Sequence, residues 1–254
     1  MIVCKSSAEI EKMRAANQLV ARILEELAAM VAPGVTTADL DAAAESRVRA
    51  GGAEPAFKGY RGYPATLCAS VNEQVVHGIP SAKPLVSGDI VSLDMGVKLN
   101  GYYGDSAVTV PVGAVDEDVT RLLRVTQEAL DKGIAQVAVG GRISDISHAI
   151  QAHVEAHGFS VVRQFVGHGI GAALHEEPQI ANYGEPGRGP RMAEGMTLAI
   201  EPMVNMGRPA VKVLSDGWTA VTKDGSLSAH FEHTVAVTKG GPLVLTMRPV
   251  VVSP

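Results

Sequence analysis

Residues 24–52, LEELAAMVAPGVTTADLDAAAESRVRAGG, decide the fold because they recur later in the chain. Residues 130–158 read LDKGIAQVAVGGRISDISHAIQAHVEAHG and match them without a gap at 10 of 29 positions. Two copies are too few for a solenoid, which needs at least three repeats. We therefore infer a duplicated helix-helix-strand unit with pseudo-twofold symmetry between its copies.

Both copies contain the signals of a helix pair. In the first half, a helix is expected to follow the Ser6–Glu9 capping-box pattern and to stop at Pro33-Gly34, and a second helix begins at a Thr36–Asp39 cap. In the second half, the apolar spacing predicts helices over 119–139 and 144–157.

A β-rich stretch follows each helix pair. Residues 90–99 and 102–110 flank Asn100-Gly101, the strongest short hairpin signal. In the second half we expect strands over 196–205 and 211–215 and hairpins at Asp216-Gly217 and Asp224-Gly225. Long helices with antiparallel hairpins indicate the α+β class. No Ser/Gly/Pro-rich linker separates the halves, so we expect one catalytic domain over 1–254, with its site where the copies meet.

Composition narrows the function. Of 254 residues 46% are hydrophobic and the net charge is −5, with no basic run longer than two residues, which argues against nucleic acid as a partner. No window reaches the roughly 18 uncharged apolar residues of a membrane span, and no signal-peptide core is seen, so we expect a soluble cytoplasmic protein. Only Cys4 and Cys68 are present, so any metal must be held by His, Asp and Glu.

The Asn100-Gly101 hairpin brings two carboxylates together. A two-residue turn there pairs Asp94 with Ala107 and leaves Asp105 two residues away on the same face, so the two acids are diagonal neighbours about 7–8 Å apart at the backbone. Two anions among apolar residues repel each other unless a cation lies between them. A shared metal is the economical interpretation, and a solvated hairpin face is the alternative.

Three further segments add candidate ligands. GHGIG at 167–171 surrounds His168 with glycines that allow close backbone approach, and MTLAIEPMV at 196–204 ends an apolar strand at Glu201, where an unpaired carboxylate is costly. SAHFEHTVAV at 228–237 places Glu232 in alternation with His230 and Thr234. Each residue alone could be a hydrogen-bonded structural group.

Together these residues predict a binuclear metal centre. Four carboxylates balance two divalent cations, and a donor set rich in oxygen suits Mn, Fe, Co or catalytic Zn. Metals about 3.5–4 Å apart lower the pKa of a bridging water. The candidate ligands are Asp94, Asp105, His168, Glu201 and Glu232.

The chain resembles methionine aminopeptidases of the short type I class, which have the pita-bread fold. The motifs NEQVVHGIP, DIVSLDMGV followed by GYYGDSAVTV, GHGIGAALHEEPQI, MTLAIEPMV and TKDGSLSAHFEHTVAVT match that family in order, over nearly the whole chain. The resemblance implies metal ligands at the five positions above and no separate N-terminal zinc-binding extension. It also implies removal of the N-terminal Met from nascent polypeptides with a small second residue, in a monomer for which the ribosome is a candidate partner.

The resemblance also assigns the remaining site residues. It implies that Glu201 accepts a proton from the attacking water, that His175 donates a hydrogen bond to the oxyanion, and that His77 lies near the nitrogen after the scissile bond. The residues that match the lining of the family's Met pocket are Tyr60, Tyr63, Cys68 and Trp218. Leu174 and Phe57 depart from the side chains that many relatives carry there.

Other patterns in the sequence give weaker evidence of function. His153 and His157 stand at i and i+4, but Glu155 is one position away from the H-E-x-x-H pattern and faces elsewhere, so we interpret this pair as a solvated or packed helix face. Two other functions remain open. A prolidase or aminopeptidase P shares the five ligands but usually carries an additional N-terminal domain, for which we expect no room. A binding module without catalysis would have no need of all five ligands.

Overall fold

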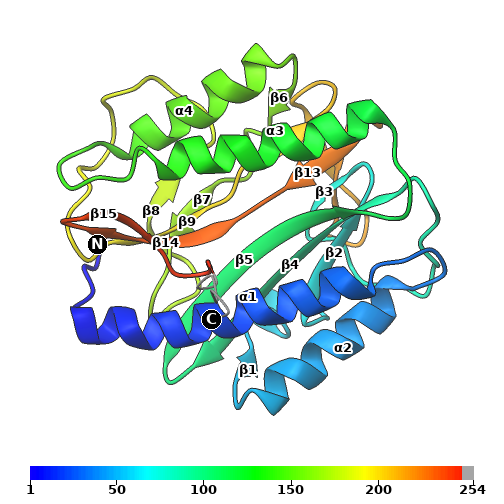
Figure 1. The fold of residues 1–254 in the computed structure, drawn as a ribbon, viewed down its shortest axis with the longest axis horizontal. Coiled ribbons are helices and arrows are strands. Elements are labelled where there is room, and N and C mark those ends of the chain that lie inside the picture. Colours follow the sequence, from blue (N-terminus) through cyan, green and yellow to red (C-terminus); the bar gives the residue numbers. More distant parts are fainter. Residues whose placement is uncertain (248–254) are drawn as a thin grey trace, which may run out of the picture.

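The computed structural model describes residues 1–247, and within them the α-helices flank the strands in two pairs (Figure 1). One pair, α1 and α2, lies on one side of the strands, and α3 and α4 lie on the other. The helices are α1 (Ser7–Met30), α2 (Thr37–Ala50), α3 (Glu117–Ile134) and α4 (Ile143–Ala156), with a 3-10 turn η1 (Tyr60–Gly62).

The first two helices begin where their capping boxes predict. The Ser6 hydroxyl accepts a hydrogen bond from the Glu9 amide (3.3 Å) and the Glu9 carboxylate accepts one from the Ser6 amide (2.8 Å), and Thr36 and Asp39 repeat this exchange at α2. Both bounds of α4 lie 106 residues after those of α2, which is the spacing of the two sequence copies.

The prediction of a helix over 119–139 is wrong at its end, because α3 stops at Ile134. The amides of Gln136 and Val137 bond to carbonyls only three residues back, so the chain tightens into turns, and the Gly140 amide bonds to the Met192 carbonyl (2.8 Å). Val137 is buried in a loop. Its burial therefore comes from the packing of the turn. Val137 continues the apolar spacing of a helix although the chain there is not helical.

The strands form four antiparallel sheets of three to five strands each among the described residues. The largest antiparallel pair is the hairpin of β4 and β5. The strands, grouped by sheet, are β1 (Glu54–Pro55), β2 (Leu67–Val71), β4 (Ile90–Leu99) and β5 (Tyr102–Pro111); β6 (Ser160–Val161), β10 (Met203–Asn205) and β13 (Ser228–His230); β3 (Gln74–Val76), β11 (Val211–Val213) and β12 (Ala220–Thr222); β7 (Gly167–Gly169), β8 (Glu176–Ile180), β9 (Thr197–Ile200), β14 (His233–Thr238) and β15 (Gly241–Val244).

The hairpin of β4 and β5 has the predicted register. Asn100 and Gly101 both have positive φ (52° and 84°), as a two-residue primed turn requires, and Asp94 pairs with Ala107 while Asp105 pairs with Gly96. The diagonal placement of the two aspartates on one face is therefore confirmed.

Two expectations for the second half are wrong. The single strand predicted over 196–205 is split at Glu201-Pro202 into β9 and β10, which belong to different sheets, because proline cannot donate to a ladder and the chain turns there. The turn at Asp224-Gly225 joins β12 to β13, which do not pair with each other, so it is no hairpin. The hairpin at Asp216-Gly217 is confirmed by the pairing of Val213 with Ala220.

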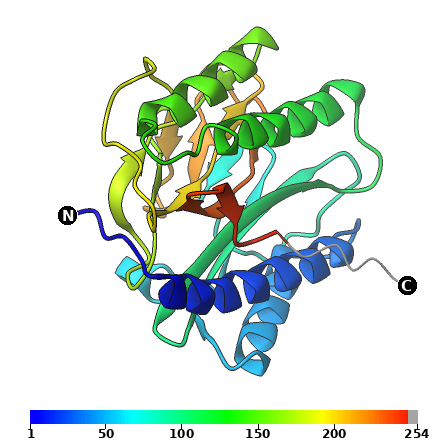
Figure 2. The ribbon, with the colours of Figure 1, turned by 60° about the vertical axis from the view of Figure 1, so that its left-hand side comes forward.

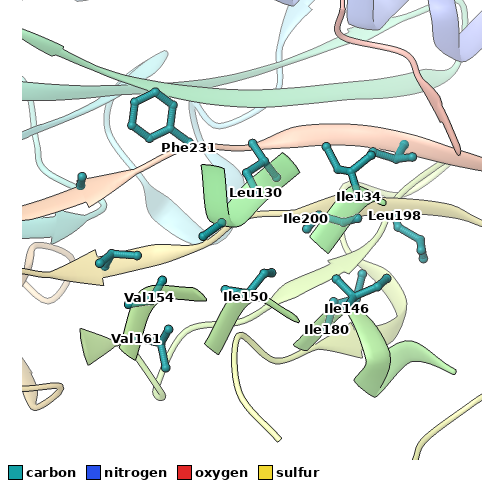
Figure 3. Close-up of a cluster of buried hydrophobic side chains, with 14 of the residues drawn as sticks. Leu130, Ile134, Ile146, Ile150, Val154, Val161, Ile180, Leu198, Ile200 and Phe231 are labelled. Atoms are coloured by element: carbon teal, nitrogen blue, oxygen red, sulfur yellow. The ribbon is translucent and has the colours of Figure 1, made fainter. Parts of the chain in front are cut away.

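Each helix pair has its own apolar core. Residues of α1 and α2 pack against β2 and β4, whereas α3 and α4 pack against strands of the second half, and the two layers remain distinct in a second view (Figure 2). Figure 3 shows Leu130, Ile146 and Ile150 of α3 and α4 clustered with Leu198 and Ile200 of β9 and with Phe231. No helix within residues 1–247 combines the length and apolar character of a membrane span.

Candidate metal centre

A cavity of about 160 Å³ lies where the β4–β5 hairpin meets the strands of the second half. Every residue that the sequence assigned to the site lines this cavity. The lining residues are Phe57, Tyr60, Arg61, Tyr63, Cys68, His77, Asp94, Asp105, His168, Leu174, His175, Glu201, Trp218 and Glu232. Ligands from distant parts of the sequence are thus brought together by the contact of the two halves.

Backbone and hydroxyl hydrogen bonds join the β4–β5 hairpin to the second half of the chain at Asp105 and Glu232. We call this contact the seam. The Glu232 amide donates to the Ala107 carbonyl (2.9 Å), and the Ser106 hydroxyl donates to the Glu232 carbonyl (2.6 Å). The Thr234 hydroxyl donates to the Asp105 carbonyl (2.9 Å). Because the backbones of both acids are engaged in this way, their carboxylates are left to face the cavity.

Those carboxylates have oxygens without a protein partner. Asp105 and Glu232 are 4% and 2% exposed, yet Asp105 Oδ1 and Glu232 Oε1 accept no hydrogen bond from any described residue. One donor atom each from Asp105, Glu232 and His168 lie within 4.8 Å of one another. Buried anions of this kind need a cation, so the donors present fit a divalent metal.

His168 and Glu201 lie beside Asp105 and Glu232 in the cavity, and we call these four residues the floor of the cavity. His168 Nε2 lies 3.6 Å from Glu201 Oε1 and 4.0 Å from Asp105 Oδ2, while its Nδ1 is 2.9 Å from the Gly169 carbonyl oxygen. This second contact holds the ring with Nε2 toward the acids, as is usual for a metal-binding histidine. A side chain at Gly169 would collide with the Glu177 carbonyl, which explains the glycine beside His168.

The cluster is electrostatically strained when no cation is bound. Burial raises the pKa of Asp94 to about 7, with Glu201 adding to the effect, and burial raises the pKa of Glu201 to about 8. Burial first, and then neighbouring carboxylates, raise the pKa of Asp105 and of Glu232 well above the usual range. Burial lowers the pKa of His168 to about 4, so this imidazole is neutral and free to bind a metal at neutral pH.

Two further histidines stand above the floor. The His175 ring lies 4.3 Å from that of His168, and its Nδ1 is 2.9 Å from the Tyr60 hydroxyl. His77 has a positive φ of 60°, uncommon for a residue other than glycine, and burial lowers its pKa to about 4. Both side chains line the cavity.

The side chains assigned to the Met pocket form one apolar wall. Tyr63 packs edge-on against Trp218 at 5.2 Å, and its hydroxyl donates to the carbonyl of Gly78 (2.9 Å), so only its ring serves the wall. Burial raises the pKa of the Cys68 thiol well above its usual value, which keeps this cysteine protonated and unreactive. Phe57 and Leu174 join the same lining.

Two polar residues beside the cavity were not assigned from the sequence. His230 is 1% exposed, with Nε2 3.5 Å from Glu201 Oε2, and Arg61 lines the cavity mouth over the Tyr60 ring at 5.3 Å. The alternation of His230 with Glu232 on the strand was the signal for the former. For Arg61 the sequence offers none, because its placement depends on a positive φ of 50° within η1.

Paired acids and a neutral imidazole beneath an apolar wall define a metal-dependent hydrolase. A family model, metallopeptidase family M24, matches residues 11–239. The chain belongs to this family.

Individual relatives and solved structures match nearly the whole of this chain. The chain is 54% identical to methionine aminopeptidase 1 of Bacillus subtilis over 97% of this chain and 99% of that one. The crystal structure of methionine aminopeptidase from Thermotoga maritima superposes with a TM-score of 0.96 at 50% identity, covering 98% of this chain and all of that one. Prolidase from Pyrococcus furiosus shares the fold at 23% identity with a TM-score of 0.80. The predicted α+β class and pita-bread fold are confirmed.

Proposed function

We propose that this protein removes the N-terminal methionine from polypeptides whose second residue is small, by metal-dependent hydrolysis. The observation that carries the proposal is the set of buried, unpaired carboxylate oxygens at the floor of a cavity with an apolar wall. The floor suits a cation and the peptide bond to be cut, and the wall suits an unbranched apolar side chain. Full-length likeness to methionine aminopeptidases supports this choice of substrate.

The five predicted ligands hold two divalent ions in this proposal. Four carboxylates balance four positive charges, and Mn, Fe, Co or Zn fits a set of four oxygen ligands and one nitrogen ligand. The ions would supply an ionised water and polarise the scissile carbonyl. The ligands are Asp94, Asp105, His168, Glu201 and Glu232, all of which line the cavity.

Protein groups move the proton and hold the oxyanion. Glu201 lies beside His168 in the cavity, so we assign it the role of taking and returning the proton of the attacking water. With the Tyr60 hydroxyl donating to His175 Nδ1, Nε2 of His175 carries the proton and can donate to the oxyanion. Neutral His77 also lines the cavity, and we assign it a hydrogen bond to the nitrogen after the scissile bond.

The recess for the methionine side chain is assigned to one group of residues. Methionine is unbranched and flexible, and its sulfur packs well against aromatic edges. We assign the recess to Tyr60, Tyr63, Cys68 and Trp218, with Phe57 and Leu174 completing it.

Initial rates on short peptides test the function. The purified protein should release the first residue of Met-Ala peptides faster than that of Met-Leu or Ala-Ala peptides, and should not cut Xaa-Pro peptides preferentially. A chelator should abolish release and Mn, Co or Fe should restore it. A preference for Xaa-Pro would indicate a prolidase-type enzyme, and full activity without metal would refute the metal centre.

The cellular setting is part of the proposal. Nascent chains are the substrates that present an N-terminal methionine, so we expect a cytoplasmic monomer that acts near the ribosome. Cell fractionation, sedimentation of the purified protein, and its co-sedimentation with ribosomes test these three expectations separately.

A further inference from the structure

A second group of metal-binding side chains lies on the outer helix pair. His153 and His157 lie one turn apart at the end of α4, and Glu128 faces them from the middle of α3. One donor atom from each of the three lies within 4.8 Å of the others. Neither α3 nor α4 contributes to the lining of the main cavity, so this group is separate from the proposed catalytic centre.

The distances are close to those of a zinc site. His153 Nε2 and Glu128 Oε2 share a hydrogen bond of 3.0 Å, and a zinc ion would take the place of the shared proton. With zinc bonds of about 2.0–2.1 Å, neighbouring ligand atoms of a tetrahedron are about 3.3 Å apart. All three donor atoms lie within 4.8 Å of one another, which is at most about 1.5 Å beyond that edge, a gap that small side-chain rotations can close.

Two of the three side chains already have the supporting contacts of metal ligands. His157 Nδ1 is 2.8 Å from the His153 carbonyl oxygen, so it donates there and leaves its Nε2 lone pair available. Arg124 donates to Glu128 Oε1 (2.7 Å), which turns Oε2 toward His153. Ligating histidines and carboxylates are usually held by such second contacts.

Charge and access also permit a cation. The Arg124 hydrogen bond lowers the pKa of Glu128, so the carboxylate is ionised at neutral pH. Arg124 engages the other oxygen, and the nearby Arg121 reaches the backbone carbonyl of His157 and not its ring. The Glu128 side chain is 37% exposed and that of His153 10%, so solvent reaches the group from the carboxylate side.

We propose that Glu128, His153 and His157 bind a zinc ion that ties the end of α4 to α3, with water as the fourth ligand. The sequence alone does not indicate this group, because the carboxylate comes from the helix that packs beside the two histidines. The proposal does not depend on the proposed peptidase activity.

Zinc titration of matched variants tests the site. At micromolar zinc, the wild type should bind one more equivalent per chain than His157→Ala, and Glu128→Gln should weaken this site at least tenfold. His148→Ala is the control, because His148 is an exposed histidine of the same helix outside the group, and it should bind as the wild type does. Equal binding by wild type and His157→Ala would overturn the proposal.

Two further readouts separate this site from the catalytic centre. Crystals soaked in zinc should show an anomalous peak between the three side chains, absent in His157→Ala, and zinc should raise the melting temperature of the wild type more than that of the variant. Methionine release by metal-loaded protein should be equal in both. An anomalous map of the wild type without this peak would refute the site even if the peptidase assay succeeds.

Discussion

Replacing Lys5 by methionine tests a buried ion pair beside the turn that carries His175. Lys5 Nζ lies 2.5 Å from Glu176 Oε2, and the two side chains are only 3% and 12% exposed. The other oxygen of Glu176 accepts the Ala173 amide (3.2 Å). This one carboxylate therefore connects the segment before α1 to the turn that carries His175.

The expected loss of stability follows from burial. Removing one partner of a buried ion pair leaves the other charge uncompensated and typically costs about 3–5 kcal/mol. Because water reaches 12% of Glu176, we expect the lower end for Lys5→Met, about 3 kcal/mol of unfolding free energy. A loss of this size is roughly a 100-fold change in the ratio of folded to unfolded protein.

Urea unfolding of the metal-loaded protein measures this loss. The double variant Lys5→Met/Glu176→Leu should lose less stability than the sum of the single variants, since it leaves no unpaired charge. Lys12→Met is the control, because Lys12 is exposed on α1 and its loss should change stability by no more than about 0.5 kcal/mol. Lys5→Met should also lower kcat for a Met-Ala peptide at unchanged metal content. A loss below about 1 kcal/mol, or additive single variants, would refute the reasoning.

Three other predictions concern the candidate metal centre. Asp105→Asn should lose at least one metal, whereas His175→Ala should keep its metal and lose roughly 100- to 1000-fold in rate; equal metal loss in both, measured by elemental analysis, would make His175 a ligand or a structural group. Metal-free protein should lose stability as pH rises from about 4.5 to 8, because Asp94 and Glu201 have pKa values of 3.8 and 4.5 when unfolded but about 7 and about 8 when folded; melting curves should show the loss, and added Mn should reverse it. Tyr60→Phe should reduce kcat more than KM, since His175 loses the bond at Nδ1 that sets its tautomer; an unchanged kcat would contradict this role.

The parts of the fold that depend on local chemistry could be predicted from the sequence. Side-chain caps set the starts of α1 and α2, and Asn100-Gly101 set the register that puts Asp94 and Asp105 on one face. The misses depend on partners distant in sequence. β9 and β10 separate at Pro202 because each pairs with a different sheet, and Glu128 joins His153 and His157 only through the packing of α3 on α4.

The candidate centre depends on the contact between the two halves more than on either half alone. Each helix pair has its own core, and the bridge between Ala107 and Glu232 joins the β4–β5 hairpin to the strands of the second half. Asp94 and Asp105 stand on one side of this bridge, and His168 and Glu201 on the other. Four acids brought together by such a contact repel one another, so metal binding and closure of the seam should stabilise each other. A metal that binds both sides therefore acts as a link between the halves as well as a catalyst.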